Sequence, residues 1–315
     1  QQQRTEWLGR AEQARTQLTE RQIRRDVRES FLELYYQLNA SRIIEQNRAL
    51  FSQLTEITRA HYAPGRVSQQ DVIQAQLELS RLDERATRIS AQADVERAKL
   101  ARWIGEAGWE RIDPAFPDLP QPPSRESLLA TLEQHPAVAV ASAQVAADQQ
   151  MVKAAREQYK PGFNVGLEYR KRFGNDIDGS DRPDMMAAMV SLDLPLFADK
   201  RQDRRLASSQ QQTEAAIQIR EQRLREVRRQ LESDYARWQR LGEQETLYRD
   251  QLLQEASANT AAALSSYQNG INEFTTLMRA RITELDVSLQ DVRIRIDHAR
   301  AQARLLYLAA DGETP

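Results

Sequence analysis

Residues 62–75 read Tyr-Ala-Pro-Gly-Arg-Val-Ser-Gln-Gln-Asp-Val-Ile-Gln-Ala and place a turn directly before an apolar periodic segment. Pro64 disfavours helix at the residue before it, and Gly65 supplies the backbone freedom that a turn needs. Upstream, residues 1–60 contain no proline and one glycine, Gly9. Downstream, residues 68–104 repeat apolar or small side chains every seven residues, which is typical of a coiled-coil seam. The two series of that repeat are Val72, Leu79, Ala86, Ala93, Leu100 and Ala75, Leu82, Ile89, Glu96, Trp103. The sequence therefore predicts a long antiparallel helical hairpin over residues 1–104, with its turn at 63–66.

A second hairpin is predicted over residues 200–315, with its turn at 267–271. A helix from Arg201 to Leu264 would be roughly 95 Å long at about 1.5 Å per residue. The return helix again carries paired heptads. Their members are Leu285, Val292, Ala299, Leu306 and Ile282, Leu289, Ile296, Ala303.

The two turn regions align without a gap at an offset of 205 residues, so the chain contains a duplicated unit. The matched pairs include Tyr62 with Tyr267, Gly65 with Gly270 and Ala75 with Ala280. Further upstream, Arg25-Asp26-Val27-Arg28 matches Arg225-Glu226-Val227-Arg228 at an offset of 200, so the second copy has gained about five residues in its helix. This register puts Gln1 opposite Arg201. We therefore expect a segment equivalent to roughly 136–200 to be missing before Gln1, and the lack of an initial methionine indicates processing or trimming.

Between the hairpins the periodicity changes. Residues 105–135 hold five prolines and predict a connector followed by a short helix that Ser124 caps. Trp109, Ile112, Phe116 and Leu119 give this connector apolar side chains to bury. A helix follows over 136–160. Residues 161–199 then alternate apolar and polar side chains in two runs of about ten residues separated by a polar loop. Such a pair of strands fits either a hairpin of a transmembrane barrel or a hairpin packed on a soluble core.

Composition excludes several classes of function. The chain has no cysteine, which excludes disulfide frameworks, zinc–cysteine sites and thiol catalysis. Its three histidines are far apart, and no nucleophile–base pair or phosphate-binding glycine loop is present. The formal charge is −2, from 44 Lys and Arg against 46 Asp and Glu, so charge balance predicts no nucleic-acid partner. We therefore expect no enzyme activity, no cofactor and no metal site.

The duplicated Tyr-x-x-Gly turn before an alanine-containing coiled-coil helix resembles that of the TolC-type outer-membrane efflux channels. The helix opening His135-Pro136-Ala137-Val138 and the strand ending at Ser191-Leu192-Asp193-Leu194-Pro195 are also similar. Resemblance to the family extends over essentially the whole chain. The amino-acid sequences of residues 182–184 and 194–201 are most similar to those of the CzcC-like heavy-metal branch of that family.

The resemblance implies a mainly α fold of coiled-coil helical hairpins in two repeats, plus one β-hairpin that belongs to a transmembrane β-barrel. The first-repeat β-hairpin is expected to be absent from this chain. Three protomers would form a twelve-stranded barrel above a periplasmic helical tunnel of about 100 Å, a length that the predicted helices accommodate. The implied function is a passive conduit from periplasm to outside in a tripartite efflux system, for heavy-metal cations. The implied partners are a periplasmic adaptor (membrane fusion protein), an inner-membrane RND-type pump and outer-membrane lipid.

The same resemblance assigns site residues to the turns. The implied adaptor-docking residues are Gly65, Arg66, Val67, Ser68, Gly270, Ile271 and Asn272. Alternatively, the two glycines only close helical hairpins. Aperture-lining positions would be Asp71, Thr276 and Arg279, of which only Asp71 is acidic. The other interpretation of Asp71 is a solvated carboxylate on the helix surface. A gate of ion pairs between protomers, from Arg66, Arg279 and Arg281 to Asp71 or Glu284, is a further hypothesis.

Three alternatives stay open at this point. The solute could be a drug or other organic molecule carried by a channel of the same family. The heptads of residues 1–104 alone would also suit a structural coiled-coil scaffold, although a scaffold has no use for an amphipathic strand hairpin. Finally, Asp176, Asp178 and Asp181 resemble a calcium loop but lack the distant glutamate that such a loop needs.

Overall fold

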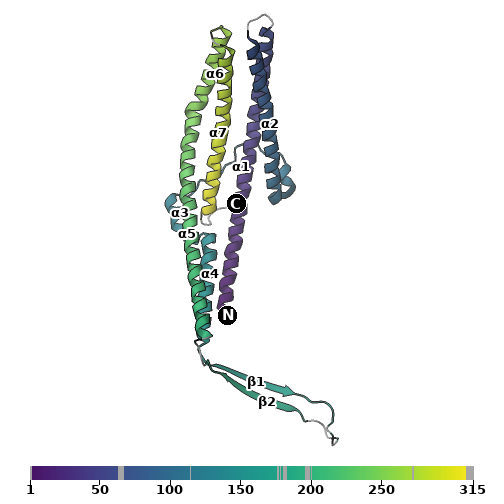
Figure 1. The fold of residues 1–315 in the computed structure, drawn as a ribbon, viewed down its shortest axis with the longest axis vertical. Helices are drawn as coiled ribbons and strands as arrows, with labels where there is room; N and C mark the ends of the chain where they lie inside the picture. Colours follow the sequence, from purple (N-terminus) through teal and green to yellow (C-terminus); the bar gives the residue numbers. More distant parts are fainter. Residues whose placement is uncertain are drawn as a thin grey trace. The chain divides into compact units, whose positions relative to one another are not determined.

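The computed structural model describes residues 2–62, 67–113, 115–175, 177, 179, 183–195, 199, 201–271 and 273–309. Figure 1 shows long helices and a hairpin of paired strands. The α-helices are α1 (Gln2–Tyr62), α2 (Gln69–Ile104), α3 (Arg125–Thr131), α4 (Pro136–Glu157), α5 (Gln202–Leu247), α6 (Leu253–Gln268) and α7 (Phe274–Leu308). The strands are β1 (Gly162–Arg170) and β2 (Met185–Asp193). The shorter helical segments with described bounds are the 3-10 helices η1 (Gly105–Trp109) and η2 (Leu132–Gln134) and the π-helix η4 (Tyr248–Leu252).

This architecture confirms the predicted fold class, which is mainly α with one antiparallel β-hairpin. The predicted cap is also confirmed, because the Ser124 side chain accepts a hydrogen bond from the first turn of α3, and Ser68 does the same for α2. Among the described helices, none combines the length and the apolarity needed to cross a bilayer. The turn at 63–66 and the aspartates Asp176, Asp178 and Asp181 lie outside the described residues.

The chain divides into two compact units, and the boundaries fall inside α1 and α5. The first unit comprises Gln1–Thr16 and Pro136–Arg225. It contains α4, both strands, and the adjoining parts of α1 and α5. Small side chains make up much of its interior, which allows helix backbones to approach closely. Its buried alanines are Ala11, Ala14, Ala143, Ala147, Ala155 and Ala216.

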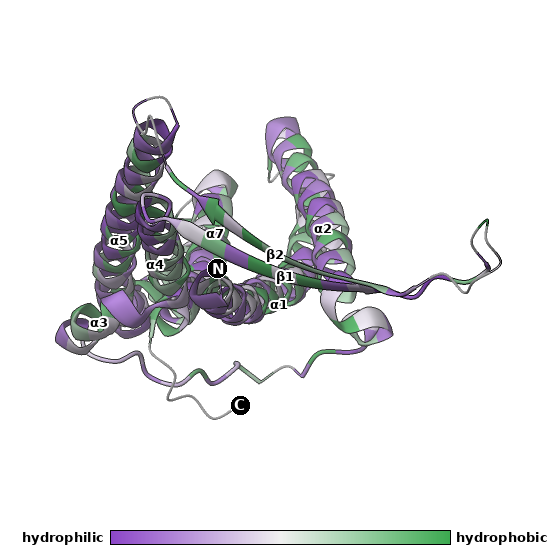
Figure 2. Cartoon of the chain, turned by 90° about the horizontal axis from the view of Figure 1, so that it is seen from below, coloured by the Kyte–Doolittle hydropathy of each residue, from purple (hydrophilic) through white to green (hydrophobic). Residues whose placement is uncertain are grey.

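The β-hairpin of the first unit presents one apolar face that no described residue covers. In the antiparallel register Phe163 pairs with Leu192, Val165 with Val190 and Tyr169 with Met186. Because side chains alternate across a strand, these six residues share one face. Asn164 and Ser191 pair on the opposite face. Every residue of both strands is exposed, and hydrophobic residues are prominent along both strands in Figure 2.

The second unit comprises Gln17–His135 and Glu226–Pro315. Its main core joins α1, α2 and α7, and α7 also packs on α6. Both predicted heptad series of α7 contribute to this core. In α2 the series through Ala75, Leu82 and Ile89 is the more buried one, and it includes the carboxylate of Glu96. Glu96 is compensated locally, because Gln92 and Lys99 each donate to Oε1 at 2.8 Å.

The π-helix η4 lies where the two repeats differ in length. The Leu253 N–H bonds the Tyr248 carbonyl oxygen, five residues back rather than four. One π turn takes up one additional residue relative to an α-helix. The second repeat has gained about five residues, and four of them make up about one α-helical turn. The π turn therefore accommodates the fifth residue.

The connector before α3 is only partly as expected. Ile112 and Leu119 pack against buried residues of α1, α2 and α7. The Phe116 ring meets Tyr35 edge-on at 5.6 Å and Arg295 at 4.8 Å, although it is still 37% exposed. Trp109 is 55% exposed, so the prediction that it is buried is wrong for this chain. Beside it, η1 lies close against α2 through Gly108, where an added Cβ would meet the Ala101 backbone nitrogen at 2.7 Å, and the Trp109 side chain stays outside this contact.

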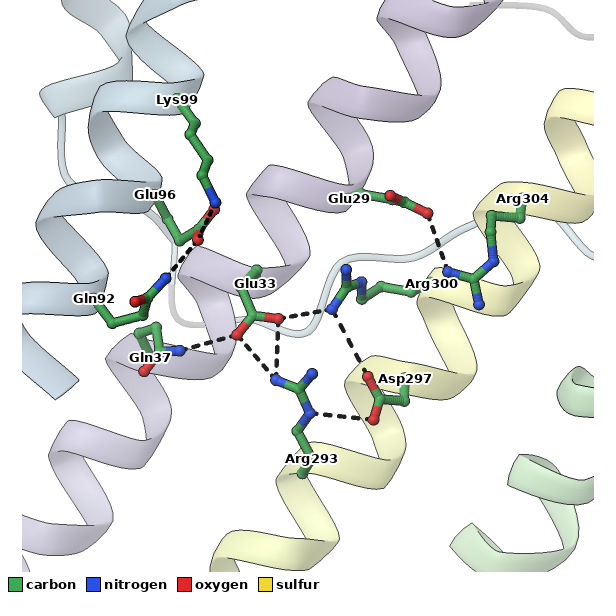
Figure 3. Close-up of polar contacts among 10 residues, drawn as sticks. All are labelled: Glu29, Glu33, Gln37, Gln92, Glu96, Lys99, Arg293, Asp297, Arg300 and Arg304. Carbon is green, nitrogen blue, oxygen red and sulfur yellow. Dashed lines mark hydrogen bonds and ion pairs between the residues drawn. The ribbon is translucent and has the colours of Figure 1, made fainter. Parts of the chain in front are cut away.

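Ion pairs join α1 to α7 across the second unit (Figure 3). The Glu33 carboxylate accepts from Arg293 at 2.9 Å and from Arg300 at 2.8 Å. One turn earlier, Glu29 accepts from Arg304 at 3.1 Å, and Arg304 also donates to Asp234 of α5. These contacts connect the first helical hairpin to the second one.

Candidate functional site

Helix α2 begins at a reciprocal cap. The Asp71 backbone N–H donates to Ser68 Oγ at 3.2 Å, and the Ser68 backbone N–H donates to Asp71 Oδ2 at 3.0 Å. The Ser68 hydroxyl donates to the same carboxylate oxygen at 2.8 Å. This capping box satisfies donors that a helix start leaves unpaired. Asp71 is therefore a capping residue of α2, and it is half-buried.

Helix α6 ends in a Schellman motif. The Ile271 N–H donates to the Ser266 carbonyl at 2.9 Å, and the Gly270 N–H donates to the Tyr267 carbonyl at 3.0 Å. The motif requires a left-handed residue, and Gly270 has φ +70°. In many such motifs the residue at the position of Ile271 packs back on the helix. Here Ile271 is 75% exposed, so this hydrophobic side chain is presented outward at the turn.

The two turn regions line one cleft of about 1080 Å³ in the second unit. Four predicted site residues contribute to its lining: Val67, Ser68, Asp71 and Gly270. The other apolar residues of the lining include Leu54, Ile57, Leu264 and Phe274, and its acidic groups are Asp71 and Glu273. Of the other predicted docking residues, Gly65, Arg66 and Asn272 lie outside the described residues.

Tyr267 also lines this cleft, although the sequence pattern assigned it no role in the site. Its ring contacts Phe274 at 5.9 Å, and its hydroxyl oxygen is buried with no hydrogen-bond partner among the described residues. Burial raises the pKa of Tyr267, and the negative charge of Asp71 raises it further. The signal was present in the duplication, since Tyr267 matches Tyr62. Only the structure distinguishes the two tyrosines: Tyr62 is 49% exposed, whereas the hydroxyl oxygen of Tyr267 is buried.

The remaining aperture positions do not join the cleft. Thr276 and Arg279 are exposed on α7. Arg281 donates to Glu284 at 3.1 Å, one turn along the same helix. Arg281 and Glu284 therefore already pair within the chain, and Asp71 is held by Ser68. For Arg281 and Glu284, ion pairs between protomers would compete with this existing contact.

The three histidines have separate environments. His61 lines the cleft. His298 Nδ1 lies 2.8 Å from Glu245 Oε2, and its ring stacks on Trp238 at 5.7 Å. His135 is 2% exposed and meets Tyr307 edge-on at 5.2 Å. In the part of the chain that the structure describes, no three histidine or acidic side chains are grouped as a metal site.

His135 makes the stability of the chain depend on pH. Burial lowers the pKa of His135 to about 4, the charge of Arg21 lowers it further, and the Tyr307 carbonyl opposes the shift. The ordinary value is about 6.5, so the unfolded chain takes up this proton first as the pH falls. The stabilising effect of the neutral ring is complete above about pH 6.5 and is lost towards pH 4, at about 1.4 kcal/mol per pH unit.

We therefore expect the free energy of unfolding to fall by roughly 2–3 kcal/mol between pH 7.5 and 4.5 through His135 alone. Urea denaturation at both pH values measures this loss. In a His135→Gln variant that part of the dependence should disappear, while the contribution of the carboxylates stays. Equal pH dependence in both proteins would contradict the assignment.

The chain is similar to known proteins in sequence and in fold. A family model described as outer membrane efflux protein matches residues 128–310. The fold is similar to that of a membrane protein from Pseudomonas aeruginosa, with a TM-score of 0.89 and 15% identity, covering 97% of this chain and 72% of that one. It is also similar to the outer membrane protein VceC from Vibrio cholerae, with a TM-score of 0.82 and 18% identity, covering 96% and 72%. The MtrE outer membrane channel of Neisseria gonorrhoeae, described in its open state, gives a TM-score of 0.77 and 14% identity, covering 96% and 70%. No curated protein matches the chain in sequence.

Proposed function

Because the chain belongs to the outer membrane efflux protein family, we propose that it is the channel subunit of a tripartite efflux system. It would serve as a passive conduit from the periplasm to the outside. The family and the structural neighbours are channels rather than enzymes. The proposed location is the bacterial outer membrane, with the helical part in the periplasm.

The observation that carries this proposal is the exposed apolar face of the β-hairpin. Phe163 is 75% exposed, Val165 68% and Val190 73%. An isolated two-stranded sheet is at best marginally stable in water, and its free edges invite further strands. Lipid on the apolar face and strands of further copies at the edges would satisfy both needs. We propose a homotrimer in which the hairpin forms part of a closed barrel. A coiled-coil scaffold, the alternative function, would leave this face without a role.

The turns are the proposed docking region for the periplasmic adaptor, through which an inner-membrane RND-type pump would drive export. Ile271 supplies an exposed apolar contact at the second turn. Val67 and Ser68 lie beside the cleft at the first turn, followed in sequence by the capped start of α2. Gly65, Arg66 and Asn272 complete this proposal on sequence alone.

We also propose that Tyr267 and Asp71 form a latch between the two helical hairpins when the channel is closed. The Tyr267 hydroxyl, which has no partner in the described part of the chain, would donate to Asp71. The Asp71 carboxylate has acceptor capacity beyond its capping bonds. Thr276 and Arg279 would line the aperture from the exposed face of α7. Tyr267→Phe should therefore raise the conductance of the closed channel several-fold in planar bilayers.

The matched control for the latch is Tyr62→Phe, which alters the exposed counterpart in the first repeat. This variant should conduct like the original protein. If Tyr267→Phe and Tyr62→Phe give the same closed-state current, the latch does not exist.

For the solute we propose heavy-metal cations, on the basis of the resemblance of residues 182–184 and 194–201 to the heavy-metal branch. The competing proposal is an organic solute. Deleting the gene should sensitise cells to divalent metals such as cadmium, zinc or cobalt while leaving resistance to organic drugs unchanged. Sensitivity to drugs alone would overturn the proposed solute and leave the channel intact.

A further inference from the structure

The cleft at the two turns has a largely apolar lining and a volume that suits a small organic molecule. Its volume of about 1080 Å³ is large enough for a drug-sized ligand. Its apolar and aromatic lining residues are Leu54, Ile57, Val67, Leu264, Tyr267 and Phe274. Sites for small molecules typically combine such a lining with a few polar groups that fix the orientation of the ligand. The polar groups of the cleft therefore decide which class of molecule it would take.

Both carboxylates of the cleft have an oxygen atom that accepts no hydrogen bond from the described residues. The two bonds that Ser68 donates to Asp71 both go to Oδ2, so Oδ1 is left over. Glu273 accepts only from Thr275, at 3.4 Å to Oε2, so Oε1 is left over as well. Neither carboxylate forms an ion pair with a described residue, and the described lining contains no lysine or arginine. The cleft therefore carries negative charge that a cation could neutralise.

The charge of Asp71 also reaches the aromatic part of the lining. Burial raises the pKa of Tyr267, and the Asp71 charge adds to that shift, so the carboxylate and the phenol ring lie within electrostatic reach of each other. An aromatic ring attracts a cation through its π electrons, and a nearby carboxylate adds Coulomb attraction. A bare metal ion would find too few ligands here, because no three histidine or acidic side chains are grouped in the described part of the chain. An organic cation could use both the charge and the apolar lining.

We propose that this cleft binds a lipophilic organic cation, a molecule with one positive charge and an aromatic or branched apolar body. The charge would lie near Asp71 and Glu273, and the body would lie against the apolar lining residues. The inference goes beyond the proposed function, because a passive conduit needs no ligand bound between its helices. It also stands apart from that function, since binding can be measured whether or not the protein conducts.

Tetraphenylphosphonium and tetraphenylborate test the role of charge, because these two ions have nearly the same size and shape but opposite charge. Isothermal titration calorimetry of the whole chain in detergent measures both, with protein-free detergent as the background. Tetraphenylphosphonium should bind at one ion per chain with a Kd of about 10 to 100 µM. Tetraphenylborate should bind at least about tenfold more weakly. Equal affinities, or no binding of either ion, would overturn the proposal, and the second result would leave the cleft to the adaptor alone.

Substitutions of the two carboxylates locate the site. Glu273→Gln and Asp71→Asn each remove one negative charge, and each should weaken the binding of tetraphenylphosphonium about three- to tenfold. Asp71 caps α2, whereas Glu273 is exposed, so Glu273→Gln is the variant that leaves the fold intact. Asp94→Asn is the matched control, because it removes the same charge from an exposed position on α2, about 35 Å along the helix from Asp71. Circular dichroism confirms that all three variants are folded. Equal affinity of Glu273→Gln and Asp94→Asn for tetraphenylphosphonium would contradict the assignment of the site.

Discussion

Val165→Lys is expected to keep the protein out of lipid bilayers. Val165 lies at the centre of the apolar face, opposite Val190, and is 68% exposed. A lysine on the lipid-facing side of a transmembrane strand costs about 2–4 kcal/mol near the bilayer midplane. Each copy in an assembled channel would bear that cost. Flotation with liposomes and cell fractionation measure the membrane-bound share, which should fall from most of the protein to a small part.

The control for this prediction is Asn164→Lys. Asn164 precedes Val165 and pairs with Ser191 on the other face of the hairpin. A lysine there would point away from lipid, so insertion should be nearly unchanged. If both variants insert equally well, the apolar face does not meet lipid, and the interpretation of the hairpin is wrong.

Glu33→Gln is expected to lower the free energy of unfolding by about 2–4 kcal/mol, because it removes the charge that two arginines share. The Glu33 side chain is 15% exposed, and those of Arg293 and Arg300 are 30% and 25% exposed. Arg300 Nε is already buried without a partner among the described residues. With Glu33 neutral, Asp297 would be the one remaining ion-pair partner of both arginines in the described part of the chain. It lies 3.9 Å from Arg300 and 3.1 Å from Arg293. Urea denaturation at pH 7 measures the loss.

The matched control is Glu20→Gln on the same helix. Glu20 accepts from Arg24 at 2.7 Å, but both side chains are more than half exposed. Exposed pairs of this kind contribute about 0–1 kcal/mol. A loss of similar size in both variants would show that the network around Glu33 does not hold α1 to α7.

Patterns that repeat along the chain could be predicted from the sequence. The heptads of α2 and α7 and the alternation of β1 and β2 are local signals, and each gave the correct element. The Ser124 cap followed from residue type at a helix start. The exception was the connector, where Trp109 is exposed because hydrophobicity alone does not say whether a neighbour is within reach.

Features that depend on distant residues could not be predicted in this way. Glu33 and Arg293 are 260 positions apart, and nothing in either segment indicates the other. The difference in length between the two repeats indicated the region in which the additional residues lie, but it did not predict that they form the π turn η4. Tyr267 and Tyr62 look equivalent in the duplication, and only tertiary packing buries the hydroxyl of one of them. Four predicted site residues line one cleft for the same reason, because tertiary packing brings together two turns that are far apart in sequence.

Single-channel recording from the purified protein in planar lipid bilayers is the most direct test of the proposed function. A passive conduit should give discrete current steps, with a conductance that increases with salt concentration and needs no energy source. Val165→Lys should give no steps at the same protein concentration. Bilayers that stay silent although the protein is assembled and bound to the lipid would contradict the channel.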